Sequence, residues 1–433
     1  MTSIQSVLAA FAIILIDLLG RAGLDKVLAL AGGPALVAHW AQLQSVVELV
    51  STVALAGVLQ GLTVLIAQVR ESRDVRSLLR AALKLGMGTS LAVALGVMLM
   101  AGFIRGEINP VLFFLAALAG WIAVIPATLN AYWLGKHQQQ RMLGLALLTS
   151  AVLLLVAGGA WFGMSLHGLM LMQCFVLVII GSVIWRYLCK LSGGDLSRAG
   201  DVQSDETRYL RRLVDFVPVG LAIGIMSPVS MLLIRGTLAD SLTWNDVGFL
   251  QALWRSTEWV TATAAGVLSL VFLPRFSATY GSARFKQEMM RAGKIVLIPA
   301  ACLLLLIYFN QRAMLATLYD ARFAVSDVTA ALFMLGSWTR IASWLFLFGL
   351  FAAHRTRLII AGEALSLPLY ALTLWLFAEG MTLERAALWY LASYLVYLAF
   401  SAASLIYSSR KSILVQSGRT GNYHAPSSNR ESR

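Results

Sequence analysis

Long runs of apolar residues recur along nearly the whole chain, and they constrain its fold more than any other feature. Each run is about 18 residues or longer, the length that a helix needs to cross roughly 30 Å of hydrocarbon. Of the 433 residues, 59% are hydrophobic and only 13% are charged, a composition that no soluble fold of this length needs. The runs do not alternate polar and apolar residues as a closed barrel would, so the sequence predicts an all-α polytopic membrane protein.

About twelve transmembrane helices are predicted, in two sets of six. The first set forms an N-terminal lobe, 1–190, and the second a C-terminal lobe, 213–408; a polar linker, 191–212, joins them, and a tail, 409–433, is expected to be disordered. Because six is an even number, the lobes share one orientation and should be related by a pseudo-two-fold axis along the membrane normal. The predicted spans are 6–30, 37–62, 81–104, 111–133, 142–163, 168–188, 213–238, 247–272, 291–310, 327–351, 359–378 and 385–408.

Lys and Arg are distributed unequally between the two sets of connecting loops, which predicts the orientation. The cytoplasmic side keeps the excess of positive charge, so both termini are expected in the cytoplasm. The net charge of +13 is mostly this signal, and the basic residues form no single patch, so no nucleic-acid partner is expected. The basic residues of the predicted cytoplasmic loops are Arg70, Arg73, Arg76, Arg80, Lys136, Arg141, Lys190, Arg198, Arg208, Arg211, Arg212, Arg275, Arg284, Lys286, Arg355 and Arg357, against Arg105, Arg312, Arg322 and Arg385 on the other face.

The N-terminus, the cysteines and the short outer loops argue against several other classes of protein. The first apolar run continues past Asp17 and Arg21 without a small-residue cleavage site, so a retained helix is expected in place of a signal peptide. Cys174 and Cys189 lie too far apart on one predicted helix to pair, and with Cys302 they form no metal-ligand pattern, so no metal or other cofactor is expected. No outer loop is long enough for the active site of a typical membrane glycosyltransferase, which favours a transporter over an enzyme.

Ionisable residues inside the predicted spans are the main candidates for function. Each costs at least ~2.5 kcal/mol at the bilayer centre unless it is paired or hydrated. A shift of about 210 residues places Glu48 on Glu258, as an internal repeat would. Helix-breaking residues in the first and seventh spans predict interrupted helices at a transport site. The intramembrane charges are Asp17, Arg21, Asp25, Lys26, Glu48, Arg235, Arg255, Glu258 and Arg340, and the helix breakers are Gly20, Gly23, Pro218, Gly220, Gly224 and Pro228.

Two interpretations of these charges are open. In the first they are structural: Asp17 pairs with Arg21, Arg255 pairs with Glu258, and Arg235 extends to the outer surface; Glu363 is then a solvated end group. In the second they line a cavity and form a transport site. The arginines Arg21, Arg235, Arg255 and Arg340 then bind a pyrophosphate or an acidic sugar, while the acids Asp17, Glu48 and Glu258 couple transport to H⁺ or Na⁺ or hold the arginines.

Short motifs in a fixed order run along most of residues 1–408. The segment 242–281 opens its span with Trp244-Asn245-Asp246-Val247-Gly248 and closes it with Leu273-Pro274-Arg275-Phe276-Ser277. The other motifs are Gly33-Pro34, Gly61, Thr63, Ala67, Gln68, Glu363 and Tyr394-Leu395-Val396-Tyr397. In this order they resemble the Wzx lipid-linked oligosaccharide flippases of the MOP exporter superfamily, those for O-antigen and enterobacterial common antigen.

The resemblance implies two six-helix lobes around a cavity lined largely by spans one, two, seven and eight. It also implies alternating-access transfer of an undecaprenyl-pyrophosphate-linked oligosaccharide to the periplasmic leaflet of the bacterial inner membrane, for lipopolysaccharide or other surface polysaccharide. By match to cavity positions it implies roles for Arg235, Glu258 and Arg340, the last standing where the enterobacterial common antigen flippases have Lys. The implied partners are the lipid-linked substrate, membrane lipids, a polysaccharide polymerase and a chain-length regulator.

The sequence departs from those flippases at two places, and other classes of protein stay open. Val64 stands where they have a basic residue, and the loop 136–141 lacks their Arg-Asp pair. The alternatives are a multidrug or organic cation exporter of the same superfamily and a membrane-embedded glycosyl-transfer enzyme. A major-facilitator transporter is disfavoured, because 70–76 does not carry its Gly-x-x-x-Asp-Arg type of motif.

Overall fold

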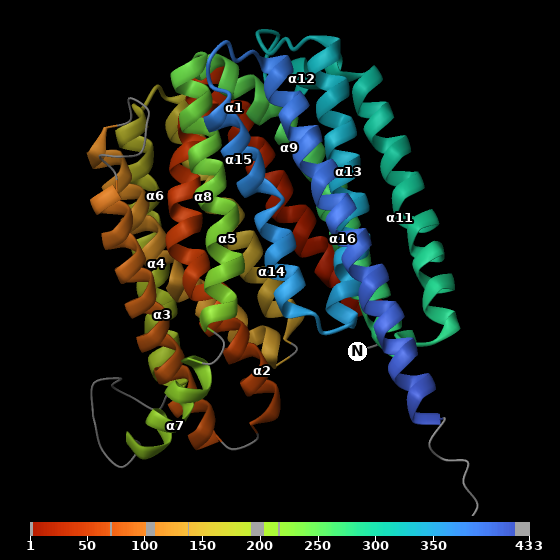
Figure 1. Ribbon diagram of the computed structural model, residues 1–433. Coiled ribbons are helices and arrows are strands. Elements are labelled where there is room, and N and C mark those ends of the chain that lie inside the picture. Colours follow the sequence, from red (N-terminus) through yellow and green to blue (C-terminus); the bar gives the residue numbers. More distant parts are fainter. Residues whose placement is uncertain are drawn as a thin grey trace, which may run out of the picture. The chain divides into compact units, whose positions relative to one another are not determined.

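The structure, a computed structural model, describes residues 3–69, 72–100, 109–136, 138–191, 203–214 and 217–420. Within these ranges all regular structure is helical (Figure 1), which confirms the all-α polytopic membrane fold. Nine of the described helices are long and apolar enough to span a membrane, and the bent pair 15–53 and 57–67 raises that number to ten. Arg70, Arg105, His137 and Arg198, with 192–202 of the predicted linker and 421–433 of the predicted tail, lie outside the described residues.

The helices follow the predicted spans closely, with a few breaks and additions. They are α1 (Ser3–Val53), η1 (Ala54–Leu59), α2 (Gln60–Gln68), α3 (Ser72–Met100), α4 (Pro110–Gly135), α5 (Gln139–Trp161), α6 (Leu166–Leu191), α7 (Gln203–Val214), α8 (Val217–Ser241), α9 (Trp244–Val267), η2 (Leu268–Phe272), α10 (Leu273–Thr279), α11 (Ala283–Phe309), α12 (Gln311–Leu318), α13 (Asp327–Ala352), α14 (Thr356–Ala364), α15 (Leu367–Leu376) and α16 (Leu383–Thr420). Helix α16 therefore carries the chain twelve residues into the tail that was predicted to be disordered.

Helix α1 contains the first predicted span and most of the second, and the loop expected at 31–36 is reduced to one non-helical residue. Gly33 has φ 68° and ψ −163°, a region of the Ramachandran map that is essentially restricted to glycine. The next residue, Pro34, has no backbone N–H with which to continue the preceding helix. Together they turn the chain between the two halves of α1.

The interruptions predicted in the first and seventh spans are wrong. Helix α1 stays helical through Gly20 and Gly23, and α8 stays helical across Pro228. A Cβ atom on Gly20 would lie 2.9 Å from the Oγ atom of Ser150, and one on Gly23 would lie 3.3 Å from the side chain of Leu154. These glycines therefore allow α5 to approach α1 closely, as small residues do between membrane helices.

The irregular segments lie elsewhere in the spans. Two π-helical turns, η1 and η2, fall late in the second and eighth spans. The shift of about 210 residues that brings Glu48 onto Glu258 also brings η1 close to η2, which agrees with an internal repeat. The eleventh span is broken between α14 and α15, at Leu365 and Ser366.

The chain forms two compact units. Unit 1 comprises 1–255, 310–326 and 370–386, and unit 2 comprises 256–309, 327–369 and 387–433. In unit 1, α1 packs against α4, α5 and α8; in unit 2, α13 packs against α10, α11 and α14. The division falls within α9 and not at 191–212, so the two sequence-based lobes stay a prediction.

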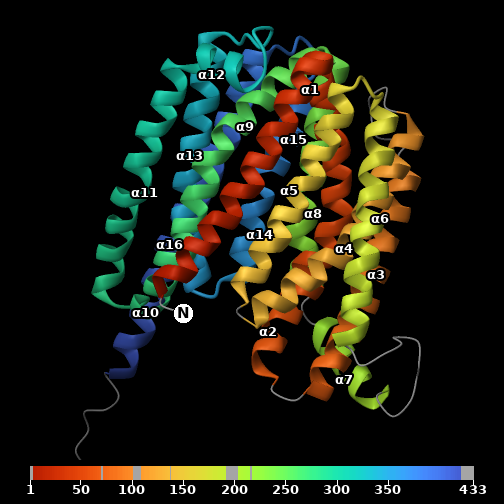
Figure 2. The ribbon, with the colours of Figure 1, turned by 180° about the vertical axis from the view of Figure 1, so that it is seen from behind.

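Most of helix α7 lies in the segment predicted as a polar linker, and its last two residues extend beyond it. Tyr209 and Leu213 are buried in the core that α3 helps to form, and Lys84 Nζ lies 2.5 Å from Glu206 Oε1. Figures 1 and 2 show α7 beside one end of α3. Burial raises the pKa of the Tyr209 phenol, which also forms a hydrogen bond with Asp74. The linker therefore includes an ordered amphipathic helix.

Candidate functional site

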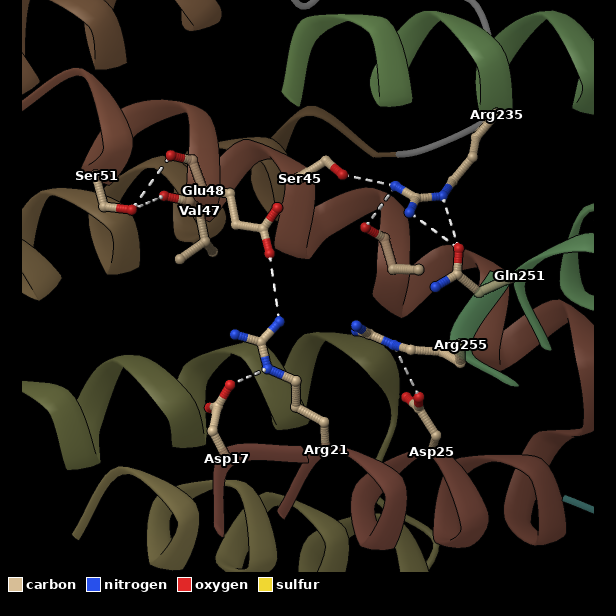
Figure 3. Close-up of polar contacts among 11 residues, drawn as sticks. Asp17, Arg21, Asp25, Ser45, Val47, Glu48, Ser51, Arg235, Gln251 and Arg255 are labelled. Atoms are coloured by element: carbon tan, nitrogen blue, oxygen red, sulfur yellow. Dashed lines mark hydrogen bonds and ion pairs between the residues drawn. The ribbon is translucent and has the colours of Figure 1, made fainter. Parts of the chain in front are cut away.

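Three helices of unit 1 bring six charged side chains into one cluster (Figure 3). The first half of α1 contributes three of them and its second half one, while α8 and α9 contribute an arginine each. The cluster consists of Asp17, Arg21, Asp25, Glu48, Arg235 and Arg255. With all six ionised, three arginines balance three carboxylates, so the cluster is electrically neutral as a whole.

Arg21 lies between two carboxylates. Its Nε atom is 3.0 Å from Asp17 Oδ2, one turn away on the same helix, and its Nη1 atom is 3.7 Å from Glu48 Oε1. The side chains of Arg21, Asp17 and Glu48 are 35%, 42% and 51% exposed. The predicted pairing of Asp17 with Arg21 is thus present, and Arg21 also links the two halves of α1 while staying accessible.

Arg235 is buried, contrary to the alternative that it extends to the outer surface. Only 6% of the residue is exposed. Its Nη1 donates to the carbonyl oxygen of Ala41 at 2.9 Å and to Ser45 Oγ at 2.6 Å. Its Nε and Nη2 donate to Gln251 Oε1 at 3.2 and 2.9 Å. The guanidinium therefore ties α8 to α1 and α9, and a phosphate could bind it only by displacing these acceptors.

Arg255 reaches across to the first span. Its Nε lies 3.2 Å from Asp25 Oδ2, with the side chains 20% and 8% exposed. One interpretation of the sequence pairs Arg255 with Glu258 on the same helix, and neither interpretation gives Asp25 a role in the transport site. The available signal was the four-residue ladder that Asp25 forms with Asp17 and Arg21, although the ladder does not reveal a partner 230 residues away.

The remaining two predicted residues, Arg340 and Glu258, lie in unit 2. The guanidinium carbon of Arg340 lies 4.7 Å from the ring centroid of Trp344 and 5.8 Å from that of Tyr394, both within the range of cation–π attraction. Arg340 is also hydrogen-bonded to Tyr390 and close enough to Glu258 for electrostatic attraction.

Glu363 belongs to the same group in unit 2. It lies at the end of α14, its carboxylate attracts Arg340, and its Oε1 accepts a hydrogen bond from Tyr397 Oη at 2.9 Å. It is therefore a partly buried member of an internal network, and not the solvated end group that the sequence suggested. The spacing of Tyr390, Tyr394 and Tyr397 along one face of α16 was the sequence signal for these aromatic partners.

The structure therefore distributes the predicted site between the two units. Asp17, Arg21, Glu48, Arg235 and Arg255 gather in unit 1, whereas Glu258 and Arg340 gather in unit 2 with Glu363. Within the described ranges, no three His, Cys, Asp or Glu side chains are arranged to hold a metal ion.

Solved structures resemble this chain over nearly its full length, although no known protein family and no curated protein matches the sequence. A multidrug resistance MATE family transporter of the MOP superfamily, in its inward-facing conformation, matches 94% of this chain and 95% of its own with a TM-score of 0.69 at 11% identity. The chain has the MOP transporter fold. Its helices thus form a multi-pass membrane protein, and transporters of this fold have twelve helices in two lobes.

Two further solved structures are similar to this chain over nearly its full length. The Vibrio cholerae MATE transporter VcmN, solved as a point mutant, gives a TM-score of 0.58 at 12% identity, over 95% of this chain and 96% of that one. A MOP superfamily transporter from Pyrococcus furiosus gives 0.56 at 12% identity, over 95% and 94%, and is described as having a binding pocket of reverse polarity that suggests a different function. The MOP fold therefore leaves the substrate of this chain to be argued from its side chains.

Proposed function

We propose that this chain moves an undecaprenyl-pyrophosphate-linked oligosaccharide, of the O-antigen or common-antigen type, from the cytoplasmic to the periplasmic leaflet of a bacterial inner membrane by alternating access. The observation that carries the proposal is Arg21, a partly exposed guanidinium within a cluster to which three helices supply arginines. Guanidinium groups form forked, permanently charged hydrogen bonds to phosphate oxygens.

The neutral charge of the cluster suggests how binding is coupled to an ion. A pyrophosphate that approaches Arg21 competes with Asp17 and Glu48, which lie 3.0 and 3.7 Å from its nitrogens. The displaced carboxylates then lack their positive partner inside the membrane, so a bound cation can take the place of Arg21. In this scheme H⁺ or Na⁺ binds these carboxylates from the periplasmic side, where the substrate is released. The ion leaves to the cytoplasm when the carboxylates pair again with Arg21, so it moves opposite to the substrate.

The other arginines have different parts in this proposal. Arg235 and Arg255 are held by Gln251, Ser45 and Asp25, so they fix the helices that carry the site and add positive potential to it. Arg340, between aromatic rings in unit 2, is a second candidate for contact with the substrate.

Complementation tests the proposal. The chain is expressed in a bacterium that lacks its own glycan-lipid flippase, and surface glycan is assayed together with the inner-leaflet pool of undecaprenyl-linked oligosaccharide. The wild type should restore surface glycan and drain the pool. Arg21→Gln should lose at least about 90% of export at normal membrane levels, Arg21→Lys should retain part of it, and the exposed control Arg186→Gln should match the wild type. Normal export by Arg21→Gln would exclude this site.

Export of cationic drugs is a second candidate. Asp17 and Glu48 are more exposed than Arg21, and carboxylates in a cavity suit organic cations. A full pool together with increased resistance to cationic drugs, lost in Glu48→Gln, would favour drug export over glycan transfer.

A further inference from the structure

The segment 310–326, which includes α12, is held by unit 1, although the chain on both sides of it belongs to unit 2. It follows α11, which ends at Phe309, and it precedes α13, which begins at Asp327. In both ribbon views α12 lies at the end of α1 where that helix turns (Figures 1 and 2). Two cationic side chains, Lys26 and Arg322, supply contacts that hold it there.

Arg322 binds the end of the first half of α1. Its Nη2 donates to the carbonyl oxygens of Ala29 at 2.9 Å and Leu30 at 3.4 Å. The Leu30 carbonyl would ordinarily accept from the amide four residues later, but residue 34 is proline and has no N–H. The C-terminal end of a helix also carries partial negative charge. Arg322 therefore supplies both a missing donor and a positive charge.

Lys26 makes the reverse contact. Its Nζ donates to the carbonyl oxygen of Tyr319 at 2.7 Å and to that of Ala316 at 3.4 Å. These carbonyls belong to the last turn of α12 and the residue after it. Each segment thus contributes a cation that caps the C-terminal end of the other's helix, and we call these contacts the reciprocal cap.

Neighbouring residues pack closely around the reciprocal cap. A Cβ atom on Gly33 would lie 3.2 Å from Arg322 Nη1, so a larger residue would press on the guanidinium. The Nε of Arg322 pairs with Asp320 and holds the pKa of that carboxyl below its usual range. Phe323 stacks on Tyr319 with ring centroids 4.9 Å apart, and meets Phe249 edge-on at 5.9 Å.

We propose that the reciprocal cap is a latch of the transport cycle: Lys26 and Arg322 hold 310–326 on α1 in the state described, and the cap must come apart in each cycle. Segment 310–326 is covalently continuous with two spans of unit 2 but is bound by unit 1, so movement of those spans pulls on the cap directly. The proposal rests on the MOP fold and on the predicted outer placement of 311–326. It does not depend on which cargo is carried.

Hydrogen exchange of the full-length protein in lipid nanodiscs, without substrate, tests whether Lys26 and Arg322 hold 310–326 on α1. Arg322→Gln and Lys26→Gln should each accelerate amide exchange in both 28–33 and 316–323 by at least about tenfold, because local opening sets the rate. Arg322→Lys, which keeps the charge, should have a smaller effect, and Lys286→Gln, an exposed lysine of α11, should have none. Unchanged exchange in both Gln variants would overturn the proposal.

A reversible cross-link tests whether the reciprocal cap must come apart during transport. Lys26→Cys and Ala316→Cys are combined in a chain whose three native cysteines are replaced by Ser, and a short bis-methanethiosulfonate reagent joins them. Export should fall at least about tenfold on cross-linking and return on reduction, while each single variant is unaffected by the reagent. Full export with the cross-link formed would overturn the latch. If no chain exports the glycan, not even the wild type, the result counts against the proposed cargo. The hydrogen-exchange experiment then tests the reciprocal cap by itself.

Discussion

Asp25 allows the contribution of one buried carboxylate to the stability of the protein to be measured. It is 6% exposed and faces Arg255, and removal of one member of a buried pair typically costs about 3–5 kcal/mol, since the other charge stays desolvated. Asp25→Asn should therefore lower the thermal unfolding temperature of the detergent-purified protein. Asp25→Leu combined with Arg255→Met should recover most of the loss in stability without recovering export.

These variants distinguish a role of the Asp25–Arg255 pair in stability from a role in transport. Recovery of both stability and export by the apolar combination would show that Arg255 has no part in transport. An unfolding temperature unchanged in Asp25→Asn would show that the contact with Arg255 does not hold α9 to α1.

Gly248 is a second residue on which the fold depends. A Cβ atom there would lie 2.1 Å from the carbonyl oxygen of Pro34, and backbone cannot give way as a flexible side chain can. Gly248→Ala should destabilise the protein by about 3 kcal/mol or more, beyond ordinary overpacking. Gly266→Ala, on the same helix with nothing within 4 Å of the added carbon, is the matched control and should be neutral by fluorescence-detected thermal unfolding. Equal unfolding temperatures of Gly248→Ala and Gly266→Ala would contradict the close contact between residue 248 and the backbone of Pro34.

At the scale of elements, α7 offers adjacent residues with opposite environments. Leu213 is fully buried against the core near α3, whereas Val214 is 48% exposed. Leu213→Ala should cost about 2–5 kcal/mol of packing and loosen α7, while Val214→Ala should change little. Limited trypsin digestion reports this directly, because α7 carries Arg208, Arg211 and Arg212. Faster cleavage is expected only in Leu213→Ala, and equal rates would show that α7 is not anchored through Leu213.

The membrane-spanning helices could be predicted from the sequence, because the bilayer determines their structure. The turn at Gly33 and helix α7 could not, because they depend on a single backbone conformation and on local packing. A long apolar run must be helical because the bilayer offers its backbone no other partner, so the spans were located well. Gly32-Gly33-Pro34 suggested a loop, yet one glycine conformation suffices for the turn. The polarity of 191–212 concealed α7, although Tyr209 and Leu213, four residues apart, were the sign of an apolar helix face.

At the scale of the whole molecule, the charge of the loops predicts the orientation. Green fluorescent protein fused to the C-terminus should fluoresce, and alkaline phosphatase fused after Glu379 should be active, because Lys and Arg concentrate on the opposite face. A phosphatase fused after Arg355 should be inactive and serves as the control. The inverted pattern would place both termini outside the cytoplasm and reverse the direction proposed for transport.

The candidate site was predictable as a set of residues but not as a set of contacts. Charges inside apolar spans are conspicuous in any sequence, and five of the seven predicted residues meet in unit 1. Their partners depend on which helices pack together: Arg255 meets Asp25 on α1, and Arg340 meets the rings of Trp344 and Tyr394. Periodicity along one helix carries no information about a neighbour 230 residues away.

The π-helical turns η1 and η2 give the second and eighth spans a freedom that a regular helix lacks. Each π turn accommodates one residue more than an α turn, and this surplus residue can pass from one turn to the next through the exchange of a few hydrogen bonds. Every residue that it passes rotates by about 100° about the helix axis. Side chains could thus be turned from one environment to another while the span keeps its length and both of its ends.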